Sequence, residues 1–544
     1  MTTADSKDRN WFDRVIVDLL RQFRWSFLPP LMVYFAAGGS GLTAIVGTFY
    51  VKDYLDLSAA FLAGLAFWAG LPWALKMPLG HLVDLIWRWK SWLIFVGAGL
   101  ITASLLIMYG LVTGAPWLPD SVAPETWYVI SVLLAPCGYV VQDAVADAMS
   151  VEAVPRLDEA GQPIDPATSK ALHTTMQTLG RFALISGASA VAALNIYQFS
   201  GVALLEISEK AEVYARIYAI AFIIPCISVS GVLLASVQKR RRIRALVQAG
   251  IDRATARARF ERGGAPVTPN WWYFIGGGAF LAMTLTVGLS EIAWSQEIVF
   301  AGSMAIVVFL MRQLIRSLSQ AQARALVGTA IIIFVFRAVP LSGQGATWFE
   351  IDVLGFDQQF LSVLSLVTSL LTLAGMVILR PLMANNSITY IVVLLTLAAG
   401  VLSLPGIGLY LGVHHWTAAM TGGVVDARFI AVINTAVESP LGQVAMIPML
   451  AWIARNAPDG LKATFFAVMA SFTNLALSAS SLGTKYLNQA FLVTREVRDA
   501  DGLITTPADY TSLGWLLTSV AIITVAAPLI TIYVIQRSPL RTED

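Results

Sequence analysis

Fourteen long apolar segments alternate with short polar ones along the chain. Six come first, at residues 27–50, 58–79, 91–112, 125–152, 169–195 and 212–236. Eight follow, at residues 271–289, 295–316, 323–340, 357–382, 387–411, 426–453, 462–486 and 511–536. Because each run is continuous and about 20 residues long, it predicts a membrane-spanning α-helix rather than a strand with alternating faces.

Positively charged residues are concentrated in every second connecting segment. If the N-terminus is cytoplasmic, the cytoplasmic segments contain 25 Lys and Arg, and the outer segments contain only Lys52, Lys210, Lys485, Arg495 and Arg498. Cytoplasmic loops of membrane proteins are enriched in Lys and Arg. We therefore expect a multi-pass protein of the inner (plasma) membrane with both termini in the cytoplasm.

The composition supports this class and excludes others. Apolar residues make up 57% of the chain and charged residues 13%, whereas soluble proteins have about a quarter charged. A net charge of +2 provides no basic excess for nucleic acid. With four histidines, two cysteines and neither a Walker loop nor a nucleophile elbow, we expect no metal, no cofactor and no enzymatic activity.

A basic segment and an internal repeat divide the chain. Residues 237–270 contain nine Lys and Arg, and residues 55–62 resemble residues 354–361 at an offset of 299. In the two copies Ser58 and Asp357 occupy the N-cap position of the next predicted helix. We therefore expect an amphipathic helix at 1–26, a six-helix bundle at 27–236, a linker at 237–270, an inserted helix pair at 271–320, a second six-helix bundle at 321–536 and a tail at 537–544.

Between the second and third predicted helices, Gly80, Asp84 and Arg88 follow the spacing of the loop signature of the major facilitator superfamily. This resemblance implies that the glycine allows close helix packing and that the aspartate and arginine hold the inner gate shut. The alternative is an ordinary polar turn. The two repeats agree with the resemblance, because that fold consists of two parallel six-helix repeats around a site near the middle of the membrane.

Two carboxylates are predicted to share one face of the fourth helix. Asp143 and Asp147 are four residues apart, with Tyr139 and Ser150 on the same side. A charge at the bilayer centre costs about 2.5–3.5 kcal/mol, so the pair should face a water-filled cavity or a basic partner. Two such carboxylates suit proton coupling. The alternative is that they contact Arg88 or the next helix as part of the gate.

Arg181 lies near the middle of the fifth predicted helix, one turn after Gln177. A guanidinium at that depth requires a carboxylate or an anionic ligand, and the expected protein partners are Asp143 and Asp147. Together Gln177 and Arg181 form a candidate solute site. Lys76, near the inner end of its helix, is expected to extend towards the membrane surface instead.

In the second half the candidate solute-binding residues are Arg337, Glu438 and Asn474. The alternative for Arg337 is that it extends outwards to solvent. Glu438 precedes Pro440, which should break its helix and free carbonyl groups to line a cavity. Glu438 is therefore also a candidate for proton coupling.

Several patches resemble two related families. Residues 142–148, with the sequence QDAVADA, are similar to the fourth helix of folate-biopterin transporters and anhydromuropeptide permeases. Residues 336–340, 354–357 and 458–474 resemble the first family. Lys462 departs from that pattern, which usually has an acidic residue there, and the inserted pair is not part of its twelve-helix plan.

We therefore expect an all-α membrane protein with the major facilitator fold and fourteen helices. The leading hypothesis is a secondary transporter of an organic, anionic solute, with protons as the second partner, and the resemblance implies folate- or pterin-like compounds. Two alternatives remain: a permease for peptidoglycan fragments, or a non-transporting assembly factor for a membrane complex. The inserted pair is a candidate surface for a protein partner.

Overall fold

The computed structural model describes residues 23–55, 57–87, 89–119, 121–154, 164–258, 269–288, 290, 292, 294–316, 319–379, 382, 386–441, 462–498 and 504–541. Structural statements below concern these residues. The predicted amphipathic helix lies almost entirely outside them, and so does Arg88 of the predicted gate.

The described residues are almost entirely helical, as the apolar runs predict. The first half contains α2 (Leu28–Gly38), α3 (Ala44–Tyr54), α4 (Ala59–Gly70), α5 (Lys76–Leu85), α6 (Ser91–Thr113), α7 (Pro124–Ala153), α8 (Pro166–Gln198), α9 (Ile207–Ala221) and α10 (Ile223–Gln248). The short 3-10 helices in this half are η2 (Trp25–Phe27), η3 (Gly39–Thr43), η4 (Leu71–Leu75) and η5 (Val202–Leu204). The linker contains α11 (Arg253–Ala258).

The inserted segment and the second half follow the same pattern. Their helices are α12 (Trp271–Gly288), α13 (Ser295–Ile315), α14 (Gln320–Arg337), α15 (Gln344–Asp352), α16 (Gln358–Ile378), α18 (Ile388–Tyr410), α19 (Val413–Met420), α20 (Ala427–Glu438), the 3-10 helix η6 (Ser439–Leu441), α22 (Lys462–Ala490) and α23 (Leu513–Gln536). A two-stranded antiparallel sheet, β1 (Val497–Arg498) with β2 (Ile504–Thr506), lies between α22 and α23.

Ten helical segments of the described residues are long and apolar enough to cross a membrane, so the predicted count of fourteen is not confirmed. The other four predicted helices coincide with α12, α14, α20 and α22. Arg324 and Arg337 lower the hydropathy of α14, and the side chains of the first residues of α22 lie outside the described part of the chain. The predicted run that contains α20, residues 426–453, extends beyond residue 441 into residues outside the described part.

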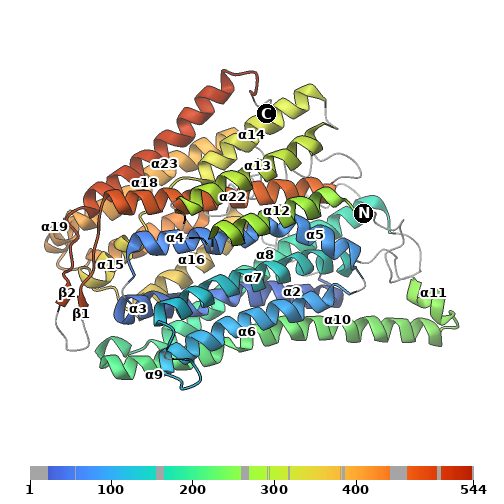
Figure 1. Ribbon diagram of the computed structural model, residues 1–544, viewed down its shortest axis with the longest axis horizontal. Helices are drawn as coiled ribbons and strands as arrows, with labels where there is room; N and C mark the ends of the chain where they lie inside the picture. The colour runs from blue at the N-terminus through green and yellow to red at the C-terminus, as the bar shows by residue number, and fades with distance from the viewer. Residues whose placement is uncertain are drawn as a thin grey trace, which may run out of the picture.

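The long helices run roughly parallel to one another along the longest axis of the molecule (Figure 1). In the first half α6 packs against α7, and α2 packs against α8 and α10. In the second half α18 packs against α23, and α14 packs against α22 and α23. Two pairs, α4 with α22 and α8 with α16, connect the halves. The exact division into two six-helix bundles stays a prediction.

Glycine determines how closely α6 and α7 approach. A Cβ atom on Gly97 would lie 2.7 Å from the carbonyl oxygen of Gly138, and one on Gly138 would lie 2.6 Å from the carbonyl oxygen of Gly97. The two backbones therefore touch where the glycines meet. Small residues at such crossings are a general means of packing helices in membranes, where the hydrophobic effect does not drive helices together.

The structure confirms the predicted helix starts in the internal repeat. The Ser58 hydroxyl accepts a hydrogen bond from the backbone N–H of Phe61 at 3.1 Å, and the Asp357 carboxylate accepts one from Phe360 at 2.7 Å. The helices before these caps are interrupted at matching places. The break between α2 and α3 is η3, and the break between α14 and α15 spans residues 338–343, which begins 299 positions later.

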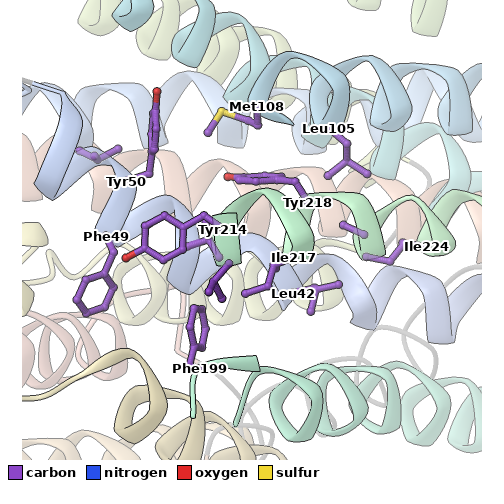
Figure 2. Close-up of a cluster of buried hydrophobic side chains, with 14 of the residues drawn as sticks. Leu42, Phe49, Tyr50, Leu105, Met108, Phe199, Tyr214, Ile217, Tyr218 and Ile224 are labelled. Atoms are coloured by element: carbon purple, nitrogen blue, oxygen red, sulfur yellow. The ribbon is translucent and has the colours of Figure 1, made fainter. Parts of the chain in front are cut away.

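The two ends of the bundle are distinct. We call the end that carries Lys52, α15 and the β-strands the Lys52 end, and the opposite end, which carries α11, the linker end (Figure 1). At the Lys52 end, apolar and aromatic side chains of α3, α6 and α9 form one buried cluster around Tyr214 and Tyr218 (Figure 2). Ile351 and Leu361 of the second half pack against this cluster. The two halves are therefore in apolar contact at the Lys52 end.

Candidate functional site

A half-buried ammonium group lies between the two predicted carboxylates. The Nζ atom of Lys76 is 2.6 Å from Oδ2 of Asp143 and 2.8 Å from Oδ2 of Asp147. Both carboxylates therefore lie on one face of α7, which confirms the prediction from their spacing. The expectation that Lys76 extends towards the membrane surface is wrong. Pairing with two nearby carboxylates stabilises its ammonium group more than extension towards distant water would.

The local backbone places Lys76 where it can meet α7. Pro72 lies at the start of η4, and its missing N–H removes one helical hydrogen bond from this turn. The chain tightens into a 3-10 segment over Leu71–Leu75, and α5 begins at Lys76. Because α4, η4 and α5 all pack against α7, the first side chain of α5 meets the C-terminal half of that helix.

Asp147 is bonded directly to α2, and it is linked to α8 through Ser150 of its own helix. The Tyr34 hydroxyl of α2 donates to Oδ1 of Asp147 at 2.8 Å. The Ser150 hydroxyl donates to the Asp147 carbonyl oxygen at 2.7 Å and accepts a hydrogen bond from Nε2 of Gln177 at 3.1 Å. The predicted solute residue Gln177 therefore touches the same cluster. Tyr34 was not predicted from the sequence, because its distance of 113 residues from Asp147 gives no local pattern.

Arg181 is near the cluster but is not its main ion-pair partner. Its charge lies close enough to Asp143 to influence that carboxylate. Among the described residues, however, Lys76 and not Arg181 forms the ion pairs with Asp143 and Asp147. With Lys76 and Arg181 both positive and both carboxylates ionised, the group is neutral as a whole. Any added proton or anionic solute changes that balance, which matters at low dielectric.

The structure does not bring all predicted solute residues together. Arg337, the last residue of α14, is half-buried, and Glu438, the last residue of α20, is exposed. Within the described part of the chain, neither forms an ion pair with the Lys76 cluster. Nδ2 of Asn474, in α22 of the second half, donates to the Trp73 carbonyl oxygen at 3.3 Å. Asn474 therefore contacts η4, the segment of the first half that precedes Lys76.

Pro440 breaks its helix as predicted. The regular helix α20 ends at Glu438, and η6 (Ser439–Leu441) follows. The carbonyl oxygen of Ser439 accepts a hydrogen bond from the Thr372 hydroxyl at 3.0 Å. This carbonyl group is therefore used by α16, the helix that packs on η6, rather than left to line a cavity.

The predicted gate is seen in part. Gly80 and Asp84 both lie in α5, and Asp84 is near His81. A Cβ atom on Gly80 would meet nothing within 4 Å among the described atoms, so Gly80 is not a site of close packing in this structure. The ion pair of the neighbouring loop is between Lys90 and Glu152, and Lys239 lies 3.9 Å from the same carboxylate. The sequence analysis did not single out this pair.

At the Lys52 end, polar contacts join the two halves. Nζ of Lys52 lies 2.7 Å from Oδ1 of Asp352, whose other oxygen accepts a hydrogen bond from the Tyr510 hydroxyl at 2.5 Å. Nε2 of Gln358 donates to the Tyr214 hydroxyl at 3.0 Å, and the Arg495 guanidinium donates to the Leu55 carbonyl oxygen. No signal in the sequence pointed to this contact: the offset of 299 makes Asp352 the counterpart of Asp53, and it does not pair Asp352 with Lys52.

The fold is shared with solved transporters of the major facilitator superfamily. The structure is similar to a POT family transporter in complex with 5-aminolevulinic acid, with a TM-score of 0.61, 13% sequence identity and coverage of 94% of this chain and 96% of that chain. It is also similar to the nucleoside transporter NupG, with a TM-score of 0.53, 12% identity and coverage of 93% and 98%. At such identity the likeness shows the fold alone: an all-α membrane protein of the major facilitator type.

The family follows from sequence comparison. Residues 38–543 match the BT1 family, and the chain belongs to this family of transmembrane transporters. The folate-biopterin transporter of Synechocystis sp. (strain ATCC 27184 / PCC 6803 / Kazusa) is 24% identical over 454 residues, which cover 83% of this chain and 72% of the relative. The resemblance to folate-biopterin transporters is therefore confirmed, and the protein is a transporter rather than an enzyme.

Proposed function

We propose that the protein carries an organic anion of the folate or pterin class together with protons by alternating access. One observation carries this proposal: Lys76 lies between Asp143 and Asp147 inside the bundle, with Arg181 nearby. The name of the relative from Synechocystis supports the solute class. A folate has carboxylate groups that an ammonium or guanidinium can bind.

The charge balance suggests how solute and proton are coupled. In the structure both carboxylates form ion pairs with the Lys76 ammonium group. Protonation of one of them weakens its hold on Lys76, and the freed ammonium, with Arg181 and the amide of Gln177, can then bind the carboxylate of the solute. Release of the proton to the other side restores the ion pairs and expels the anion. Asp143 and Asp147 are thus the proton-coupling residues of this scheme.

The second half supplies the opposite wall of the proposed site. Arg337 is a half-buried cation with no ion-pair partner among the residues that the structure describes, which suits a second contact with an anion. Glu438 is a further candidate for a proton site, and Asn474 already reaches the backbone next to Lys76. Rocking of the two six-helix bundles, residues 27–236 and 321–536, would bring these groups towards the solute.

We further propose that the Lys52 end faces outwards and that the membrane is the inner (plasma) membrane. Support comes from the basic residues, which are concentrated at the linker end, in α10, α11 and their neighbours. In this orientation Lys52, Asp352 and Arg495 close the outer side of the protein. Asp84 and Arg88 would close the inner side in the other state.

Uptake into proteoliposomes tests the proposal. Purified protein is reconstituted, a pH gradient is imposed, and accumulation of radiolabelled folate is compared with that of biopterin and of a peptidoglycan fragment. We expect gradient-driven uptake of folate and its loss in the Asp143→Asn and Lys76→Met variants. Glu212→Gln, which removes an exposed carboxylate of α9, serves as the matched control and should transport normally.

Two results would count against the proposal. Uptake that ignores both the pH gradient and the Asp143→Asn change would refute proton coupling through this cluster. Uptake of the peptidoglycan fragment alone would refute the proposed solute class while leaving the site intact.

A further inference from the structure

The inserted pair α12 and α13 lies across the line where the two halves meet. In Figure 1 the two green helices run beside the blue α4 and α5 and the orange-red α22. The contacts agree, because α12 packs against α5 of the first half, and α13 packs against α22 of the second half and also touches α4. The pair therefore covers the contact between α4 and α22, which we call the α4–α22 seam.

One side chain in the pair is bonded to both halves. Nε2 of Gln296, at the start of α13, donates to the Gly64 carbonyl oxygen of α4 at 3.2 Å. Oε1 of the same amide accepts a hydrogen bond from Nζ of Lys485 of α22 at 2.9 Å. A Cβ atom on Gly64 would lie 2.8 Å from Nε2 of Gln296. Glycine at this position therefore lets the amide reach the backbone of α4.

The two attachments of Gln296 differ in strength. On the α22 side, Lys485 also lies 3.4 Å from Oε1 of Glu297, and the Tyr486 hydroxyl donates to the same carboxylate. On the α4 side the polar contact of Gln296 is one neutral hydrogen bond, to the Gly64 carbonyl oxygen. Charged hydrogen bonds are roughly twice as strong as neutral ones. The bond to α4 is thus the weaker attachment.

Apolar packing also attaches α13 to the second half. Val307, Leu310 and Met311 of α13 belong to one buried cluster with Leu326 and Ile333 of α14. This cluster contains no residue of the first half among those described. Val299 of α13 also packs with Phe67 of α4 in a smaller buried cluster, which includes Leu482 of α22 as well. Because α13 packs more extensively on α22 than on α4, it should stay with the second half and separate from α4 when the halves move apart at the Lys52 end.

The other helix of the pair is attached to the first half at the linker end. The backbone N–H of Asn270, just before α12, donates to Nε2 of His81 at 2.9 Å. Along α12, a Cβ atom on Gly277 would lie 3.0 Å from the ring of Pro78. The pair is thus fixed to the first half near one end of the bundle and to the second half near the other.

We propose that the inserted helix pair is a strap over the α4–α22 seam, and that the hydrogen bond between Gln296 and Gly64 is its releasable link. The strap stabilises the state that is closed at the Lys52 end, and the link breaks each time that end opens. The strap thereby controls the ratio of protein that is open at the Lys52 end to protein that is closed there. The proposal does not depend on which solute is carried.

Spin-label distances in the absence of solute test the strap separately from transport. Labels are placed on Leu204→Cys and Leu411→Cys, two exposed positions at the Lys52 end of opposite halves, in a Cys137→Ser/Cys226→Ser background. Gln296→Glu keeps the partner for Lys485 but cannot donate to Gly64. Gln296→Leu removes both bonds, and Gly64→Ala pushes the amide away from α4.

We expect each of these three variants to raise the ratio of open to closed protein about fivefold, which corresponds to the loss of one neutral hydrogen bond. Thr286→Val is the control, since this exposed hydroxyl of α12 bonds only to its own helix and should leave the ratio unchanged. Distances in Gln296→Glu and Gln296→Leu that equal those of the parent would overturn the proposal. An increase in Gln296→Leu alone would also overturn it, because Lys485 and not Gly64 would then be the link. If Gln296→Leu fails to fold, the near-isosteric Gln296→Glu decides.

Discussion

Removal of the Lys76 ammonium is the sharpest test of the candidate site. At 2.6 Å from Asp143 and an effective dielectric constant of about 20, the attraction between the two charges is roughly 6 kcal/mol before desolvation. The net effect is smaller, and loss of one partner of a buried pair costs about 3–5 kcal/mol because the other charge is left uncompensated. We therefore expect Lys76→Met to lower the midpoint of thermal unfolding strongly.

The charge count predicts a rescue. Lys76→Met leaves two carboxylates and Arg181, a net charge of −1 for the cluster if all are ionised. The double variant Lys76→Met/Asp143→Asn returns the cluster to neutrality, because Asp147 and Arg181 are then its two charges. The double variant should therefore be more stable than Lys76→Met alone, with a coupling energy of about 2–3 kcal/mol. It should not transport, since the ammonium that receives the solute is gone.

Thermal unfolding in detergent and folate uptake in proteoliposomes measure the two effects. Asp147→Asn is the matched comparison for Asp143→Asn, because the Asp147 side chain is 42% exposed and that of Asp143 only 16%. Solvent screens the more exposed pair, so Asp147→Asn should destabilise less. Strictly additive losses of stability in the double variant would refute the charge-balance reasoning.

Two further predictions concern the contacts outside the site. Lys52→Ala removes the ion pair with Asp352 and should raise the fraction of protein that is open at the Lys52 end about fivefold, and the exchange Lys52→Asp/Asp352→Lys should recover part of the closed state. The reactivity of a cysteine introduced at Leu361 measures the opening. Equal reactivity in all forms would contradict the role of this ion pair in closure. Ser58→Ala should cost about 0.5–2 kcal/mol through loss of the N-cap, and Ser58→Thr should cost less. Asp357→Ala should cost more than Asp357→Asn, because both variants lose the exposed ion pair with Arg428 but only the alanine loses the cap. Thermal unfolding checks this, and no difference between the alanine and conservative variants would refute the capping role.

Much of the architecture could be predicted from local patterns. The apolar runs gave the helices, and residues three or four apart gave the shared face of Asp143 and Asp147 and the caps at Ser58 and Asp357. Each of these depends on neighbours within one helical turn. The count of fourteen spans was not confirmed, since ten helical segments among the described residues are long and apolar enough to cross a membrane.

The contacts between distant segments could not be predicted. Lys76 was expected to extend to the membrane surface, since a single lysine near a helix end usually does so. Its actual partners lie on α7, and which helix faces which depends on packing of the whole bundle. The same holds for the Lys90–Glu152 pair and for Gln296, whose two partners are 232 and 189 residues away.

The sequence by itself determined that this protein lies in a membrane, where its helices are and which family it resembles, because hydropathy, capping and motif spacing are local properties. It also identified the few charged residues inside the predicted membrane helices, such as Asp143, Asp147 and Arg181, which the topology does not explain. Only the tertiary structure decided how those charges are used: which ammonium lies between Asp143 and Asp147, which residues join the halves at the Lys52 end, and where the inserted pair is attached. The physical reason is that a charge inside a bilayer must find its partner on another helix, and the partner is set by the packing of the whole chain.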